Sequence, residues 1–134
     1  MSYDLAAFDL SVAPENAASF QDWYLGVMDG DAEPTGVKTG SPLGSWVALM
    51  EEEFPNEDDA TDDTGDNEED LADYSSSYPA LVYVAFSWEV VERARTRGLE
   101  AAGRVNVGIF ALSDDVPSVY VPNGSGGMTK KFEF

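Results

Sequence analysis

The chain of 134 residues contains no cysteine and no histidine, and it has only seven lysines and arginines. The lack of cysteine excludes disulfides, thiolate nucleophiles and zinc–thiolate sites. The lack of histidine removes the usual general base and excludes catalytic triads built on imidazole. The N-terminus has no basic start followed by an apolar run, and no apolar run approaches the roughly 18 residues that span a bilayer. We therefore expect a cytoplasmic protein without a membrane segment.

Acidic residues are abundant, and their distribution is uneven. There are 26 of them, which gives a formal net charge of -19, and 13 lie between Glu51 and Asp73, where no basic residue occurs. Like charges at this density repel each other and stay solvated, so we expect an acidic, mobile loop at residues 56–73. A molecule with this charge repels nucleic acid and anionic membranes and attracts basic proteins.

The remaining sequence predicts a single domain over residues 1–134, because 43% of the chain is hydrophobic. Apolar segments predict strands at residues 3–10, 80–86, 105–112, 116–121 and 128–134, and the segment at 80–86 is apolar on both faces, which favours a central position in the sheet. Helical spacing of apolar residues predicts helices at residues 14–28, 42–54 and 88–102. The unit at residues 80–112 favours a crossover between parallel neighbours. We expect an α/β (α+β) fold in the order β-α-α-β-α-β-β-β, with a small mixed β-sheet and three helices packed mainly on one side.

The aromatic and basic residues of the predicted helices have plain structural interpretations. Trp23, Trp46 and Trp88 each fall inside a predicted helix, so we expect core or half-buried positions. The predicted third helix carries three arginines, at positions 93, 95 and 97. We expect these arginines on a solvated face, with pairing to the acidic loop as the alternative.

Carboxylates are the remaining side chains that could support catalysis, since glycosidases need only a well-placed pair. Outside the acidic loop, the candidates for such a pair are Asp9, Asp22, Asp114 and Asp115. The simpler interpretation of each is a solvated acid in a turn or on a helix surface. We therefore expect a protein that is not an enzyme, with no catalytic residue and no cofactor.

The acidic loop also invites comparison with a calcium-binding EF-hand loop, in which a glycine at position 6 is followed by a glutamate at position 12. Aligning Gly65 to position 6 places Ala60 at position 1 and Leu71 at position 12. Both of these residues lack the required side-chain oxygen, so the motif fails. We expect no specific metal site, although weak binding of divalent cations by the loop remains open.

Two tyrosines follow the acidic run at the point where the chain returns to the fold. Aromatic side chains beside a charged rim are typical of interface centres, where they often provide much of the binding energy. Simple packing at the base of the loop is the alternative. The predicted partner-binding residues, which are acids of the loop and these tyrosines, are Glu57, Asp58, Asp59, Asp62, Asp63, Asp66, Glu68, Glu69, Asp70, Tyr74 and Tyr78.

Three segments carry a resemblance to known proteins: Met1 to Phe8, Leu81 to Trp88 and Val107 to Phe110. They resemble a group of small, acidic, mostly uncharacterised bacterial proteins. In size, architecture and charge, the chain also resembles the immunity proteins of bacterial toxin systems. That resemblance implies a binding protein that blocks a cognate toxin, often a basic nuclease, by covering its active site. No functional residue is transferred from either group.

The sequence therefore leaves three hypotheses. The first is an inhibitor that binds a basic protein partner in a fixed ratio, steered by its acidic surface. The second is an acidic protein of a salt-loving organism whose charge serves solubility. Clustering of half the acid in one loop argues against this second hypothesis, and the low lysine content argues for it. The third is a hydrolase that uses two close carboxylates.

Overall fold

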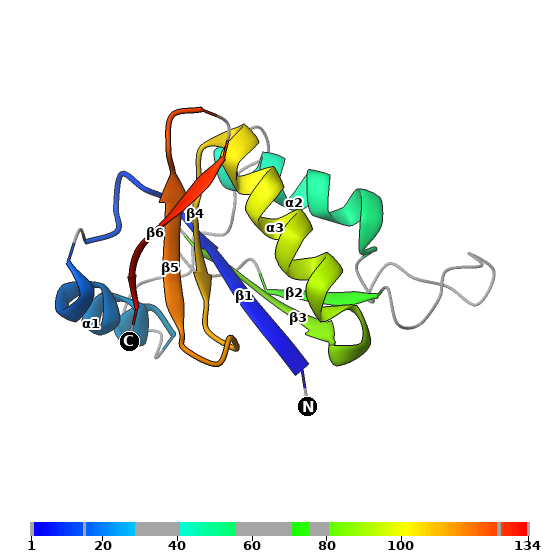
Figure 1. The fold of residues 1–134 in the computed structure, drawn as a ribbon, viewed down its shortest axis with the longest axis horizontal. Coiled ribbons are helices and arrows are strands. Elements are labelled where there is room, and N and C mark those ends of the chain that lie inside the picture. Colours follow the sequence, from blue (N-terminus) through cyan, green and yellow to red (C-terminus); the bar gives the residue numbers. More distant parts are fainter. Residues whose placement is uncertain are drawn as a thin grey trace.

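A computed structural model describes residues 2–14, 16–28, 41–55, 71–75, 81–125 and 127–133. Six strands, three α-helices and one 3₁₀ turn are found in these ranges (Figure 1). Their order along the chain is β1 (Ser2–Phe8), α1 (Ala17–Met28), α2 (Pro42–Glu53), β2 (Ala72–Ser75), β3 (Leu81–Ser87), η2 (Trp88–Val90), α3 (Val91–Val105), β4 (Gly108–Ala111), β5 (Ser118–Pro122) and β6 (Met128–Glu133). The predicted α+β fold class is confirmed. Within the described ranges, no helix is long and apolar enough to cross a membrane.

The strands form one six-stranded sheet in the order β2-β3-β1-β4-β5-β6, and every neighbouring pair is antiparallel. The prediction of a mixed sheet with parallel neighbours is therefore wrong. Strands β3 and β4, which precede and follow helix α3 in the chain, do run in the same direction. Strand β1 lies between them in the sheet and pairs with both. The N-terminal strand can fill this central position because its side chains are apolar on both faces.

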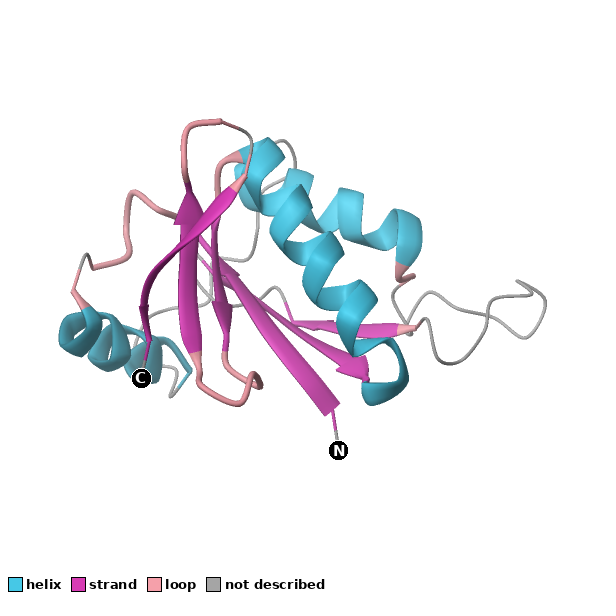
Figure 2. Cartoon of the chain, viewed as in Figure 1, coloured by secondary structure: helices cyan, strands magenta, loops and turns pink. Residues whose placement is uncertain are grey.

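The alternation of side chains along β1 divides the core into two layers. Leu5 and Ala7 pack on the face covered by α2 and α3, while Ala6 and Phe8 pack on the face covered by α1. Figure 2 shows α1 apart from the pair formed by α2 and α3. The expectation that three helices lie mainly on one side needs this correction. The physical reason is that a central strand with two apolar faces must be covered on both.

Strand β2 overlaps the acidic loop predicted at residues 56–73, so that prediction is wrong at its C-terminal end. Ala72 and Asp73 instead pair with Phe86 and Ala85 of β3, at one edge of the sheet. The strand is only four residues long and carries an aspartate, so it has little of the apolar pattern by which strands are recognised. Residues 56–70 lie outside the described ranges.

One local signal in the sequence marks the start of α2. The Ser41 hydroxyl accepts a hydrogen bond from the Gly44 N–H at 3.1 Å and caps α2, whose first residue is Pro42.

The ends of the third helix differ from the predicted residues 88 and 102. It begins with the 3₁₀ turn η2 and continues past Ala102, ending where Asn106 takes a left-handed conformation with φ of 66°. An asparagine can adopt this conformation at low cost and so ends a helix in the way that glycine commonly does.

Candidate partner-binding surface

The acidic segment leaves the fold and returns to it at one place. The Ala72 N–H donates a hydrogen bond to the Pro55 carbonyl oxygen at 2.9 Å, so the end of α2 and the start of β2 lie side by side. The nine predicted partner-binding acids from Glu57 to Asp70, and Tyr78, lie outside the described residues. The structure describes the residues that join this segment to the fold, at the end of α2 and in β2, and we call them the base of the segment.

Tyr74 belongs to that base and is buried. Its side chain is 8% exposed, and its hydroxyl donates a hydrogen bond to the Phe54 carbonyl oxygen at 2.7 Å. Burial, with a smaller contribution from the negative charge of Glu51, raises the pKa of Tyr74 well above its ordinary value. This position matches the alternative interpretation, in which Tyr74 packs at the loop base.

The glutamates in the last turn of α2 have counter-charges on α3. Glu52 accepts from Arg97 Nη2 at 3.0 Å, and Glu53 lies 3.4 Å from Arg93 Nε. Arg97 also donates to the Leu49 carbonyl oxygen at 3.0 Å, which ties the two helices together. Part of the acidic stretch is therefore compensated, which the local sequence cannot show because Glu52 and Arg97 are 45 residues apart. Arg93 and Arg97 thus pair with glutamates of α2, and the Arg93 side chain is 52% exposed, in keeping with the predicted solvated face. The alternative of pairing with the predicted loop concerns residues that lie mostly outside the described ranges.

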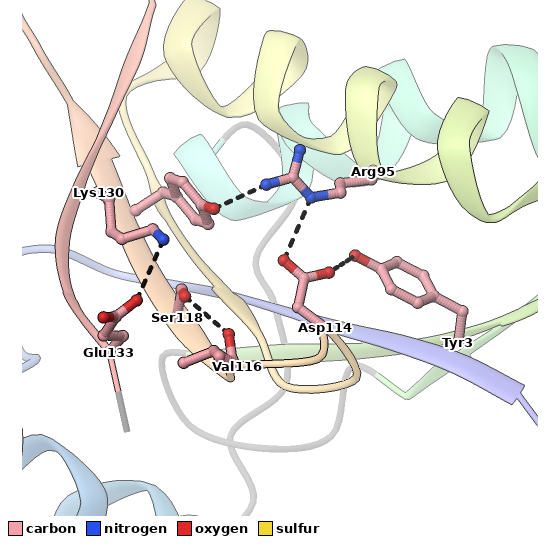
Figure 3. A network of polar contacts seen from close by, with 8 residues as sticks. Tyr3, Arg95, Asp114, Val116, Ser118, Lys130 and Glu133 are labelled. Atoms are coloured by element: carbon pink, nitrogen blue, oxygen red, sulfur yellow. Dashed lines mark hydrogen bonds and ion pairs between the residues drawn. The ribbon is translucent and has the colours of Figure 1, made fainter.

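Arg95 takes part in a second network on the same side of the sheet, which connects α3, β1 and the loop between β4 and β5 (Figure 3). Its Nε donates to Asp114 Oδ2 at 3.2 Å and its Nη2 donates to Tyr120 Oη at 2.7 Å. The Tyr3 hydroxyl donates to the other oxygen of Asp114, Oδ1, at 2.6 Å. Both oxygens of the Asp114 carboxylate are thus occupied by protein donors.

The pKa values of two members of this network, Tyr3 and Arg95, are raised. Burial raises the pKa of Tyr3 well above its ordinary value, and the hydrogen bond to Asp114 raises it further. Burial lowers the pKa of Arg95, but the hydrogen bond to Asp114 and its negative charge outweigh burial and raise the pKa overall. Asp114 is therefore an anchor that holds the β4–β5 loop against the helix and the central strand.

Of the other carboxylates considered for catalysis, Asp9 has a structural position, whereas Asp22 and Asp115 are exposed. Asp9 accepts hydrogen bonds from the Ser11 N–H at 2.9 Å and from the Ser11 hydroxyl at 2.7 Å, which closes the turn after β1. Asp22 is exposed on α1. In the part of the chain that the structure describes, no group of three or more acidic side chains is placed to hold a metal ion.

A cleft of about 380 Å³ lies beside the Arg95 network, and the sequence does not predict it. It is open to solvent, and its wall includes Tyr3, Trp88, Arg95, Asp115 and Val116. Trp88 is 41% exposed and Val116 is 47% exposed, whereas Trp46 is fully buried. The position of Trp88 directly after the capping residue Ser87, in the first turn of a helical segment, is the one signal that could have suggested exposure.

Comparison of the chain with protein families, with curated proteins and with solved structures found no significant match. The function is therefore inferred from the charge, the surface and the contacts described above.

Proposed function

We propose that this chain is a non-enzymatic, cytoplasmic binding protein that recognises a basic protein through its acidic segment. The observation that carries the proposal is the presence of nine carboxylates between Glu57 and Asp70, with no basic residue among them. The residues that flank this segment are joined by the hydrogen bond from the Ala72 N–H to the Pro55 carbonyl oxygen. A dense negative charge accelerates encounter with a positive partner and opposes encounter with acidic ones.

The distribution of positive charge supports this proposal. Among the described residues, Arg93, Arg95, Arg97 and Lys130 each form an ion pair with a carboxylate of the same chain. The three arginines connect α3 to α2 and to the β4–β5 loop, and Lys130 pairs within β6. The charge that remains for a partner is therefore overwhelmingly negative, in keeping with the net charge of -19.

The role that fits such a protein is that of an immunity protein, which neutralises a cognate toxin by covering its active site. A nuclease binds phosphate groups with basic side chains, and a row of carboxylates can occupy the same positions. The resemblance in size and acidity to immunity proteins supports this role. The proposal therefore names a basic, nuclease-like bacterial toxin as the partner.

The positions of two candidate carboxylates, Asp114 and Asp9, support a binding role over hydrolysis. A glycosidase keeps its two carboxyl groups free to face the substrate. In this chain both oxygens of Asp114 accept hydrogen bonds from Tyr3 and Arg95, and Asp9 closes a turn. These groups have positions that hold the fold together.

The proposal is tested by capture from the native host on immobilised protein, followed by purification of the captured protein and assay of its activity. We expect a basic protein that forms a stable complex of fixed ratio and loses its enzymatic activity as the ratio is reached. A matched control is the variant in which residues 57–70 are replaced by a short Gly-Ser linker, and it should capture much less. A protein that captures no basic partner, and that needs molar salt to remain folded, would contradict the proposal and favour an adaptation to high salt.

A further inference from the structure

Exposed apolar side chains at the cleft identify a second part of the surface that is suited to binding. In the described part of the chain, four large hydrophobic side chains are exposed, and two of them, Trp88 and Val116, line the same cleft. The other two, Val12 and Leu25, do not line it. Exposure of a large apolar ring to water has an unfavourable free energy, and tryptophan is among the residue types most enriched at the energetic centres of interfaces.

The indole of Trp88 is held in place by its surroundings. Its ring packs edge-on against Tyr3, with ring centroids 5.7 Å apart and planes at 68°. Tyr3 is itself fixed by its hydrogen bond to Asp114, and the turn that carries Trp88 is capped by the Ser87 hydroxyl, which accepts from the Glu89 N–H at 3.3 Å. A side chain presented in this way loses little conformational freedom when a partner binds.

The charge of the cleft wall favours a cationic occupant. Arg95 and Lys130 line the wall, but each is neutralised by its own partner, Asp114 and Glu133 respectively. Asp115 also lines the wall and is exposed, and within the described ranges no ion pair reaches it. The wall therefore offers an aromatic surface and an available carboxylate, on a molecule with a net charge of -19.

We propose, on the basis of the function proposed above, that this cleft receives an arginine side chain of the basic partner. A guanidinium group is planar, so it stacks on an indole while donating hydrogen bonds to a carboxylate at its edge. Trp88 supplies the stacking surface, Asp115 accepts the hydrogen bonds, and Val116 covers the aliphatic part of the side chain. The acidic segment attracts the partner over long range, and the cleft provides the short-range anchor.

The test uses the full chain and a defined probe, a short acetylated peptide with three arginines separated by glycines, at about 150 mM salt to weaken long-range attraction. Binding is followed by NMR through the indole N–H signals of Trp23, Trp46 and Trp88, assigned by single substitutions. We expect a saturable shift of the Trp88 signal alone. The matching lysine peptide, which has the same charge, should bind about fivefold more weakly because it cannot stack as well.

Two variants at the cleft and one elsewhere complete the test. Trp88→Ala and Asp115→Asn should each weaken binding of the arginine peptide by about fivefold, and Leu25→Ala, which removes an exposed side chain from α1, should not. Thermal melting checks that Trp88→Ala is folded. If Trp88→Ala is unfolded, binding of the arginine peptide to Asp115→Asn decides the test. Equal affinity of both cleft variants and the parent, or an unmoved Trp88 signal, would overturn the assignment of the cleft. That result would leave the basic partner itself unaffected, because partner capture is read out separately.

Discussion

The Ala72 N–H donates a hydrogen bond to the carbonyl oxygen of Pro55 at 2.9 Å, which brings together two residues that flank the acidic segment. Two residues further along β2, the Tyr74 hydroxyl makes a second bond to the same turn, at the Phe54 carbonyl oxygen. A segment whose ends are already joined can change in length or charge with little effect on the rest of the fold. This arrangement separates the charge that we propose attracts a partner from the contacts that maintain stability.

Replacement of residues 57–70 by a four-residue Gly-Ser linker should therefore leave the free energy of unfolding unchanged or raise it by about 1 kcal/mol, because a shorter loop costs less to close. Denaturant melting measures this. The Tyr74→Phe variant keeps the segment but removes the hydrogen bond to Phe54, and it should lose about 1 kcal/mol. A loss of several kcal/mol on replacing the segment would mean that these residues pack into the core.

Phe86→Ala should lower the free energy of unfolding by about 3–5 kcal/mol, the usual range for emptying a buried aromatic site. Phe86 is 1% exposed and packs edge-on against Phe54, with ring centroids 5.2 Å apart. The control Leu25→Ala removes a side chain that is 51% exposed and should cost less than about 1 kcal/mol. Equal effects of the two substitutions in denaturant melting would show that Phe86 is not part of the core.

Gly108→Ala should destabilise the protein by about 1–3 kcal/mol through overpacking. Gly108 lies directly opposite Phe8 in the β1–β4 pair, and a methyl group there would stand 2.2 Å from the Phe8 ring. In a Phe8→Leu background, the added methyl group should cost clearly less, because the ring that it strikes is gone. Strictly additive effects of the two substitutions would contradict this packing.

Stability should fall above about pH 10, where tyrosine ionises in the unfolded chain. Burial raises the pKa of Tyr3 and of Tyr74, so both stay protonated in the folded state while the unfolded state loses their protons. Their contribution is therefore complete below the unfolded pKa and is lost as pH rises, by about 1.4 kcal/mol per pH unit for each tyrosine. In melts between about pH 9 and 11, the double variant Tyr3→Phe, Tyr74→Phe should show a shallower decline. Parallel stability curves for the double variant and the parent would contradict the raised pKa values of Tyr3 and Tyr74.

The sequence predicted the main elements because their signals are local. Ser41 and Pro42 mark the start of α2, and the apolar run from Leu81 identifies β3, both as observed. The sheet order could not be predicted in the same way. An apolar strand such as β1 fits a central position next to either a parallel or an antiparallel neighbour, and only the full packing decides.

The same limit applies to the candidate surface. The acidity of residues 51–73 is visible in the sequence, but the counter-charges of Glu52 and Glu53 are not, since Arg97 and Arg93 meet these glutamates only after α3 packs on α2. The exposure of Trp88 also depends on tertiary structure. Its helical context predicts a core or half-buried position, and this is wrong, because Trp88 is 41% exposed and lines a cleft formed partly by the β4–β5 loop.

The most direct test of the proposed function is the rate of association with the captured partner, measured at two ionic strengths, about 50 and 300 mM. Neutralising Asp58, Asp59, Asp62 and Asp63 to Asn should slow association and flatten its salt dependence, with little change in dissociation. The control removes the same formal charge elsewhere, at Asp22, Asp29, Asp31 and Glu33, and should have a smaller effect. Association that is unchanged by the first set, or reduced equally by both, would contradict recognition through the acidic segment.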